Sequence, residues 1–268
     1  MINARKEIQT FLDKGNINFP DEVVLGKALA QVYKTNPPSV VEKNTPLIDE
    51  KRVRKVINKS SAGYLSPKES IAILDAIGVP RAIEVVESDK EKILQEIRKL
   101  SFPIVMKVVG PLHKTDVKGV VLNVSSLEEA ADVFDDLMMI KDSKAVLVQP
   151  MFFGIELFVG VKKEIGFNHT ILCGLGGVYI EVMNDVAAGL SPLSKIEVGN
   201  MIKSLRGYDI IKGTRGELGI NEELFIDVVH RISALTQIAP EIIEMDINPL
   251  IGEENKLTAV DVRIRIEK

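Results

Sequence analysis

The side chains with the most evident chemistry lie in residues 102–124, which read FPIVMKVVGPLHKTDVKGVVLNV. Lys107 is the single charge in an apolar run that predicts a strand, so its ammonium group either reaches out of the sheet or faces an anion. A Gly-Pro pair then ends the strand, and a polar loop follows with His113, Lys114, Thr115 and Asp116. A neutral imidazole is a usable nucleophile near neutral pH, which makes His113 a candidate transient acceptor of phosphate. The stretch therefore predicts a site that handles phosphate groups.

A second group of polar side chains lies in EMDINPL, residues 244–250, and TAVDVR, residues 258–263. On a strand, Glu244, Asp246 and Asn248 share one face because side chains alternate. Asp261 follows on the next strand-like run. Oxygen donors on neighbouring strands suit a Mg²⁺ ion that nucleotide phosphates also hold. The alternative is a polar, solvent-facing side of an antiparallel pair, and the spacing alone favours neither interpretation.

Two glycine-containing segments predict weaker anion-binding features. Gly174, Gly176 and Gly177 lie in GLGGVYIE, where glycines let backbone amides approach an oxyanion. A tight turn between strands explains this run as well. Arg215, in KGTRGE, could bind a phosphate through two parallel hydrogen bonds, and an exposed loop is the alternative.

A proline-broken strand end predicts a contact with a nucleoside. Val146–Gln149 is strand-like and Pro150 interrupts it. Backbone groups from Gln149 through Pro150 to Met151 could read the edge of an adenine, and Glu156 could accept a ribose hydroxyl. An ordinary strand turn is the alternative interpretation.

Composition excludes several classes of protein. Hydrophobic residues make up 46% and charged residues 27% of the 268 residues, and the formal net charge is -4. No charge of one sign dominates, which argues against nucleic acid or an anionic membrane as partner. The apolar runs are too short to span a bilayer, and the N-terminus lacks a signal-peptide core, so we expect a cytoplasmic protein. A single cysteine, Cys173, excludes an intrachain disulfide and a cysteine-rich zinc site.

The elements that must position these residues follow from periodicity and capping. Helix starts with a hydroxyl cap and a carboxylate three residues later are predicted at 66–69, 88–91, 126–129 and 194–197. Strands are predicted at 82–86, 104–109, 120–124, 145–149, 156–161, 170–172, 242–251 and 257–264, and a long amphipathic helix at 221–237. On that helix we expect His230 at the surface, beside Asp227 and Arg231. The pattern predicts a mixed α and β fold in two interleaved lobes.

The N-terminal residues differ from this main body. Residues 34–60 contain paired prolines and mixed charges, the composition of a linker. Before them, Asp21 caps a predicted helix with a helical apolar period. So small a segment buries little surface, so we expect the first forty residues to be the tail of another domain or to dock on the main body. The expected division is 1–60 for this extension and linker, and 61–268 for the main domain.

Taken in order, these segments resemble the ATP-grasp subunit of NDP-forming acyl-CoA synthetases, the family of ADP-forming acetyl-CoA synthetase. The resemblance covers residues 66–264 and depends on Met106-Lys107 with the 113–116 loop, the glycine run 174–177, and DINP, 246–249, with Asp261. It implies an α/β (α+β) ATP-grasp fold of two interleaved lobes. It also implies that acid, CoA and NTP are interconverted with acyl-CoA, NDP and phosphate through a phosphohistidine.

The resemblance also implies roles for single residues, with ATP or ADP and Mg²⁺ as cofactors. Lys107 is similar to the lysine that holds nucleotide phosphates, Gln149 to Phe152 to the adenine hinge, and Glu156 to the ribose contact. Asn248 and Asp261 resemble the Mg²⁺ ligands. Asp246 resembles the acid that orients the incoming phosphohistidine, and His113 a second, transient phosphoryl acceptor. The remaining expected nucleotide contacts are Pro150, Met151, Lys114, Gly174, Gly176, Gly177 and Arg215.

The N-terminal segment from Asn16 to Asp21, with the following helix, is similar to the closing strand and helix of the family's CoA-binding part. The chain would then be the C-terminal part of a fused polypeptide, or be cut from one. The primary phosphorylated histidine and the CoA site would lie outside it. We therefore expect an alpha, CoA-binding partner or fused domain, a small-molecule nucleotide, no nucleic acid, no membrane, and an oligomer.

Two departures from the family pattern motivate rival hypotheses. Lys118 stands where the family's loop has its first glycine, and residues 164–169, EIGFNH, replace the family's Asp-Pro-x-Phe-Gly-Pro. The loop can still close if Lys118 adopts a negative φ. One rival is a non-catalytic ATP-grasp regulatory module attached to an acyltransferase. The other is an ATP-grasp ligase that forms an acyl phosphate directly, without a histidine relay.

Overall fold

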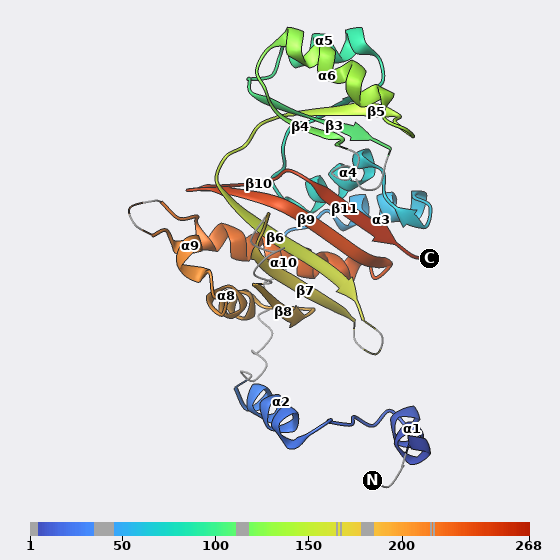
Figure 1. The fold of residues 1–268 in the computed structure, drawn as a ribbon, viewed down its shortest axis with the longest axis vertical. Helices are drawn as coiled ribbons and strands as arrows, with labels where there is room; N and C mark the ends of the chain where they lie inside the picture. The colour runs from blue at the N-terminus through green and yellow to red at the C-terminus, as the bar shows by residue number, and fades with distance from the viewer. Residues whose placement is uncertain are drawn as a thin grey trace. The chain divides into compact units, whose positions relative to one another are not determined.

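The computed structural model describes residues 5–34, 46–110, 118–164, 166, 168–177, 185–214, 216 and 218–268. The chain divides into two compact units, Met1–Val41 and Glu42–Lys268. The first unit contains α1 (Arg5–Asp13) and α2 (Glu22–Lys34), labelled in Figure 1. The Asp21 carboxylate accepts a hydrogen bond from the Val24 N–H at 2.8 Å, which confirms the predicted cap. Neither helix buries a side chain.

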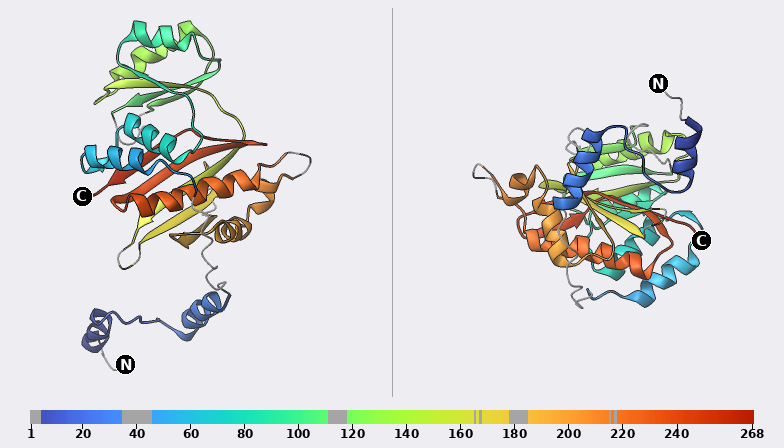
Figure 2. Two further views of the ribbon diagram at one scale, coloured as in Figure 1. Left: turned by 180° about the vertical axis from the view of Figure 1, so that it is seen from behind. Right: turned by 90° about the horizontal axis from the view of Figure 1, so that it is seen from below.

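The larger sheet of the second unit is antiparallel throughout its described strands, in the order β1-β11-β9-β6-β7-β8, with β10 also paired to β9. Its strands are β1 (Gly63–Tyr64), β6 (Ile155–Lys163), β7 (His169–Leu175), β8 (Val186–Leu190), β9 (Ile242–Glu253), β10 (Lys256–Ala259) and β11 (Val262–Ile266). Helices α3 (Glu50–Lys59), α4 (Pro67–Ile77), α8 (Lys195–Lys203), α9 (Tyr208–Lys212) and α10 (Glu222–Ile238) accompany this sheet. Figure 2 shows α10 crossing the covered face of the sheet. The opposite face of β9 and β6 carries no helix among the described elements and is hollowed along β9.

The smaller sheet has the order β2-β5-β3-β4, again antiparallel. Its strands are β2 (Val85–Glu87), β3 (Ile104–Val109), β4 (Val120–Val124) and β5 (Ala145–Pro150). Helices α5 (Lys90–Ile97) and α6 (Leu127–Met139) cover one face, over the fully buried Ile104, Met106 and Val108. Because side chains alternate along a strand, Lys107 points away from these helices, toward the larger sheet. The mixed α/β, two-lobed prediction is confirmed.

Capping decides where several helices begin. The predicted capping boxes at Ser66 and Ser194 are both present, and Ser126 caps α6 through the Glu129 N–H at 3.1 Å. The prediction for α5 is wrong by one residue. Asp89, rather than Ser88, caps that helix by accepting from the Lys92 N–H at 3.0 Å, because its carboxylate can reach the same orphan amides.

The linker prediction for residues 34–60 is wrong where α3 forms. Val53 and Ile57 are fully buried in the core of the larger sheet, and the Arg54 guanidinium pairs with Glu241 at 2.7 Å. An apolar stripe at a spacing of four was hidden among the charged residues of that segment. The division at residue 60 itself stays a prediction.

The strand predicted at 257–264 is two strands. β10 and β11 lie along the same edge of β9 and are separated at Val260 and Asp261. There the Val260 N–H donates to the Pro249 carbonyl at 3.0 Å, and the Asn248 N–H to the Asp261 carbonyl at 3.2 Å. The irregularity brings two candidate site residues, Asn248 and Asp261, opposite each other.

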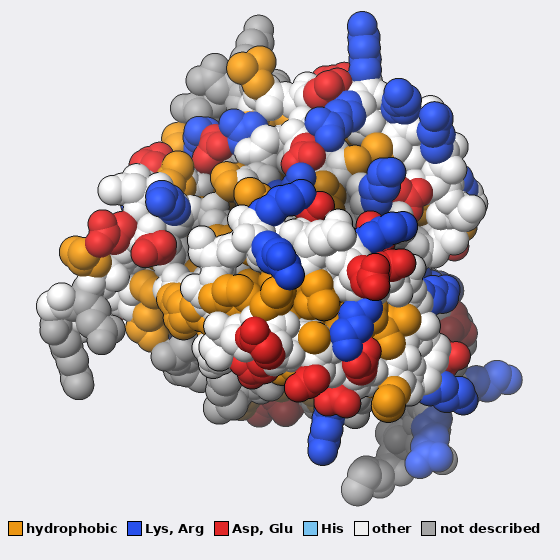
Figure 3. Space-filling model, turned by 90° about the horizontal axis from the view of Figure 1, so that it is seen from above, with side chains coloured by type: hydrophobic (Ala, Val, Ile, Leu, Met, Phe, Trp, Pro, Cys, Tyr) orange, Lys and Arg blue, Asp and Glu red, His pale blue; other side chains and the backbone are white. Residues whose placement is uncertain are grey.

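The surface agrees with the near-balanced composition. Figure 3 shows Lys and Arg side chains interspersed with Asp and Glu over one whole face. Within the described part of the chain, no helix is both long and apolar enough to cross a membrane.

Candidate functional site

Lys107 and Gln149 connect the smaller sheet to the larger one. The Lys107 Nζ donates to the Val260 carbonyl at 3.3 Å. With the Gln149 amide oriented so that its nitrogen donates to the same carbonyl at 3.3 Å, its oxygen accepts from Lys107 Nζ at 3.2 Å. Lys107 is only 7% exposed and Gln149 is fully buried. The lysine therefore does not snorkel to bulk solvent, and its ammonium is held at the junction of the sheets, beside Asp261.

A cavity of about 450 Å³ opens beside Lys107. Its charged lining comes from both sheets and from the segment after α4, and consists of Arg81, Glu84, Lys107, Lys144, Asp261 and Arg263. Cations outnumber carboxylates in this set, so the cavity favours an anion. Arg81, Lys144 and Arg263 were not predicted. Arg263 could have been found, because it follows Asp261 at the two-residue spacing of one strand face, whereas only tertiary folding brings Arg81 and Lys144 here.

Asn248 and Asp261 present two oxygen donors side by side. Their backbones pair across β9 and the start of β11, so their side chains leave the same side of the sheet. The Asn248 Oδ1 accepts from the Gly177 N–H at 3.3 Å, which fixes the amide oxygen. The described residues contain no cluster of three or more His, Cys, Asp or Glu with metal-binding geometry. Two neutral or anionic oxygen donors of this kind fit a Mg²⁺ ion that takes its remaining ligands from phosphates and water.

The glycine run closes over Glu156. The Gly176 N–H donates to the Glu156 carbonyl at 2.7 Å, and a Cβ on Gly177 would overlap the Glu156 carboxylate. Gly177 also has a φ of +56°, a conformation that glycine adopts without strain. Glu156, Gly176, Gly177 and Asn248 are thus brought together as predicted neighbours. Gly174 lies within β7, where a Cβ would overlap the Asp185 carbonyl, so packing of β7 on β8 is sufficient to explain this glycine.

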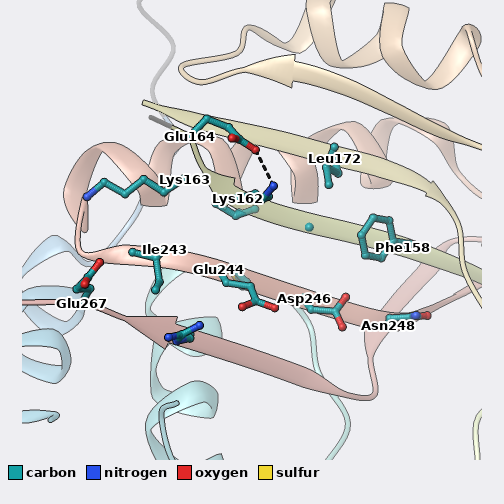
Figure 4. A pocket seen from close by; sticks show the side chains of 14 residues that line it. Phe158, Lys162, Lys163, Glu164, Leu172, Ile243, Glu244, Asp246, Asn248 and Glu267 are labelled. Carbon is teal, nitrogen blue, oxygen red and sulfur yellow. Dashed lines mark ion pairs between the residues drawn. The ribbon is translucent and has the colours of Figure 1, made fainter. Parts of the chain in front are cut away.

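Asp246 lies on the open face of the larger sheet, in a row with Glu244 and Asn248 along β9 (Figure 4). Burial raises the pKa of Asp246 to about 6, against the opposing effect of Arg263, while Asp261 and Glu244 raise it further. Arg263 is its direct cross-strand partner. One carboxylate oxygen of Asp246 is buried without a hydrogen-bond partner among the described residues. Such an orphan acceptor is costly unless a ligand meets it.

This row forms the floor of a second, larger hollow of about 850 Å³, which extends along β9 from Asn248 toward Glu267. Gly160 leaves room for the Phe158 ring, because a Cβ there would lie 2.7 Å from the tip of that ring. Across the hollow, Lys162 pairs with Glu164 at 3.0 Å (Figure 4).

The predicted hinge lies between the two sheets. Pro150 ends β5 and is half-buried, and the Met151 N–H donates to the Pro103 carbonyl at 2.9 Å. That amide is therefore committed to the protein.

Several predicted residues lie outside the described residues: His113, Lys114, Thr115, Asp116 and Arg215. Lys118, which follows the loop, is described and has a φ of +53°. It therefore takes the left-handed conformation rather than the negative φ considered from sequence. The backbone follows the path that a glycine would allow, with the strain of a side chain added.

The two described histidines are buried. The His169 Nε2 lies 2.7 Å from the Ile242 carbonyl. Burial lowers the pKa of His169; the hydrogen bond to the Ile242 carbonyl opposes this shift, and Lys163 adds to it. His230 is only 8% exposed, so the prediction of a surface position is wrong. The reason is that α10 is packed against α3, α4, α8 and the sheet, which leaves it little solvated surface.

Comparison with known proteins agrees with this geometry. A family model described as an ATP-grasp domain matches residues 56–266. The beta subunit of the ADP-forming acetate-CoA ligase I of Pyrococcus furiosus is 32% identical over 225 residues, covering 80% of this chain and 97% of that subunit. The ADP-forming acetate-CoA ligase I of Archaeoglobus fulgidus is 30% identical over 262 residues, covering 92% of this chain. The chain spans only 38% of the length of that second relative.

Solved structures of an acetyl-coenzyme A synthetase of Ca. Korarchaeum cryptofilum share the fold. One, in complex with coenzyme A and Ca-AMPCP, has a TM-score of 0.74 and 28% identity over 82% of this chain and 100% of that chain. Another contains coenzyme A and Mg-AMPPCP, with its phosphohistidine segment pointing towards the nucleotide-binding site. It has a TM-score of 0.69 and 29% identity, with the same coverage of both chains.

Proposed function

Because the chain belongs to the ATP-grasp domain family and, within it, to the beta subunits of ADP-forming acetate-CoA ligases, we propose that it binds Mg-ATP or Mg-ADP and transfers the terminal phosphoryl group to and from a histidine of a CoA-binding partner. The full reaction would convert an acid, CoA and ATP into acyl-CoA, ADP and phosphate, and the reverse. The acid and the CoA would bind to the partner.

The observation that carries the proposal is the junction at Val260. Its carbonyl accepts from Lys107 of the smaller sheet, and the next residue, Asp261, pairs with Asn248 of the larger sheet. Lys107 of the smaller sheet and Asp261 of the larger sheet therefore line one cavity with an excess of cations, and Asn248, paired with Asp261, lines the neighbouring hollow. A nucleotide triphosphate with a divalent cation is the ligand class that uses both kinds of group at once.

Each residue can be given a task. Lys107 would neutralise phosphate oxygens, and Glu156, exposed beside Gly177, would accept a ribose hydroxyl. Asn248 and Asp261 would hold Mg²⁺, which when bound there offsets the charge on the phosphates. The orphan oxygen of Asp246 would accept the N–H of the incoming imidazole. The other imidazole nitrogen would then form its bond to the γ-phosphorus while the bond from that phosphorus to the bridging oxygen breaks and ADP leaves.

The left-handed φ of Lys118 supports catalysis over the non-catalytic alternative. Lys118 has a φ that a glycine at the same position would adopt without strain. The substitution therefore changes the side chain and the local strain but keeps a backbone conformation that glycine allows.

Calorimetric titration with Mg-ATP tests nucleotide binding. We expect binding to the wild-type chain and at least a tenfold weaker dissociation constant for Asp261→Ala, which loses one oxygen ligand. Asp132→Ala, an exposed carboxylate on α6, is the matched control and should bind as wild type. Absence of binding at millimolar Mg-ATP would refute the proposal.

The histidine relay needs its own test. Incubation with γ-labelled ATP and the CoA-binding partner should place acid-labile, base-stable phosphate on a partner histidine. Formation of acyl-CoA without any such label would favour the direct acyl-phosphate route instead.

A further inference from the structure

Arg263 lies at the boundary between the cavity beside Lys107 and the hollow along β9. It is exposed on β11 and lines the cavity together with Lys107 and Asp261. Its direct cross-strand partner on β9, Asp246, lines the hollow instead (Figure 4). Side chains directly opposite each other in an antiparallel pair leave the same face of the sheet, with Cβ atoms about 4.5–5.5 Å apart. One arginine side chain can therefore reach groups in both spaces.

The guanidinium group of Arg263 is less committed to the protein than the neighbouring cations of the cavity are. Arg81 is half-buried and paired with Asp75 at 2.8 Å, and the buried Lys107 donates to a backbone carbonyl at 3.3 Å. One oxygen of Asp246 has no hydrogen-bond partner among the described residues. Arg263, although directly opposite, therefore does not satisfy that oxygen. Its exposed side chain can turn to meet an anion.

The position of Arg263 suits a phosphoryl group in transit. The group would start beside Asp261, the proposed Mg²⁺ ligand, and would end on an imidazole held by Asp246. Arg263 follows Asp261 at the two-residue spacing of one strand face and is paired across the strands with Asp246. A guanidinium is always charged and offers two parallel N–H donors to two oxygens of one phosphoryl group. It can thus contact that group at both ends of the path.

The next arginine on the same strand face does not have this position. Arg265 is the cross-strand partner of Glu244, one pair further along the two strands. Its guanidinium carbon lies 5.9 Å from the centre of the Tyr64 ring, and it lines the hollow rather than the cavity beside Lys107. Arg265 therefore offers a comparison in which the residue type, the strand and the face are the same and only the neighbours differ.

We propose that Arg263 is a catalytic residue that binds the oxygens of the transferred phosphoryl group, first in ATP and then on the partner's histidine. This inference rests on the proposed function. An unprotonated imidazole nitrogen forms its bond to the γ-phosphorus while the bond from that phosphorus to the bridging oxygen breaks. The electron pair of the broken bond leaves with ADP, and Arg263 keeps its protons throughout. Its charge stabilises the negative charge that is spread over the equatorial oxygens during transfer.

Calorimetry of the full-length chain with Mg-ATP and with Mg-ADP tests this role. Arg263→Gln should weaken Mg-ATP binding about tenfold and Mg-ADP binding less than about twofold, because ADP lacks the phosphoryl group that the arginine contacts. Arg263→Lys keeps the charge but loses the paired donors, and its Mg-ATP affinity should lie between those of wild type and Arg263→Gln. Arg265→Gln is the matched control and should bind both nucleotides as wild type does.

Single-turnover transfer to the histidine of the CoA-binding partner is the second readout. Arg263→Gln should slow it by about 30-fold at saturating Mg-ATP, since the contact strengthens as charge develops in the transition state. Arg263→Lys should restore part of the rate, and Arg265→Gln should keep all of it. The melting temperature should stay at the wild-type value in all three variants, because both arginines are exposed.

The outcomes separate this role from its alternatives. Equal weakening of Mg-ATP and Mg-ADP in Arg263→Gln would overturn the assignment and place the arginine at the inner phosphates. Affinities and rates equal to wild type would overturn it as well, and equal losses in Arg263→Gln and Arg265→Gln would reduce it to an effect of net charge. A wild-type chain that binds no Mg-ATP would instead refute the proposed function, before any variant is compared.

Discussion

The two sheets of the second unit differ in whether the buried polar groups at their junction and open face are hydrogen-bonded. On the smaller sheet, Lys107 and Gln149 are buried and satisfied by each other and by Val260. On the larger sheet, Asp246 keeps a buried oxygen without a partner and stands on an open face. Protein oxygens already hold the buried ammonium group of Lys107 in position, so a small anion can bind beside it. An acid left unsatisfied on an open face needs a visiting group, and we infer that the group is a side chain of the partner.

The largest effect should come from the smaller sheet, where the buried polar groups are hydrogen-bonded. Lys107→Met removes the ammonium but keeps a long apolar side chain, and should slow phosphoryl transfer to histidine by about 100-fold, equivalent to the roughly 1.5–3 kcal/mol of a hydrogen bond to a charged group. Its melting temperature should fall, because the fully buried Gln149 oxygen loses the donor that satisfied it.

Single-turnover phosphorylation and thermal unfolding measure these two effects. Lys144→Met, in the same cavity but on an exposed side chain, is the control and should lose less than tenfold. A Lys107→Met chain as active as wild type would show that the cavity beside it is not the phosphate site.

On the larger sheet, where one oxygen of Asp246 is unsatisfied, we expect a smaller effect on phosphoryl transfer and a pH-dependent effect on the melting temperature. Asp246→Asn should lower the rate of transfer to the partner histidine by about tenfold, since an amide is a weaker acceptor than a carboxylate, and leave Mg-ATP affinity unchanged. Because the folded-state pKa of Asp246 is raised to about 6, ionisation above that pH disfavours folding. The amide should therefore raise the melting temperature at pH 7.5 and give no such gain at pH 4.

Transfer rates, calorimetry and melting curves at both pH values distinguish this from a structural role. Glu244→Gln, exposed on the same row, is the matched control and should change little. Equal loss of ATP affinity and transfer rate in Asp246→Asn would place Asp246 in nucleotide binding instead.

The smallest effect concerns the hairpin of the smaller sheet. Lys118→Gly should raise the free energy of unfolding by about 0.5–1 kcal/mol, because relief of roughly 1–2 kcal/mol of left-handed strain exceeds the roughly 0.4–1 kcal/mol of added freedom in the unfolded chain. Urea unfolding measures it. Lys141→Gly, at a lysine whose φ is not positive, should be destabilised, and a loss of stability in both variants would contradict the strained conformation of Lys118.

Local rules accounted for much of the fold. β3 and β4 have the bounds that their apolar runs predict, and the capping boxes place α4 and α8. Errors arose where a neighbour in space decided the outcome. The amphipathic stripe of α3 is apparent only against the core that buries Val53 and Ile57, and His230 is buried because other helices surround α10.

For the site, the sequence by itself determined the chemistry: a lysine in an apolar strand, alternating acids and an asparagine on another, and a glycine run. These follow from residue type and from the two-residue period of strands, both of which are local properties. Only the tertiary structure decided that Val260 joins Lys107 to Asp261, that Gly177 holds the Asn248 oxygen, and that one oxygen of Asp246 has no hydrogen-bond partner among the described residues. These contacts join residues up to 153 positions apart, and no local period encodes which strands will meet.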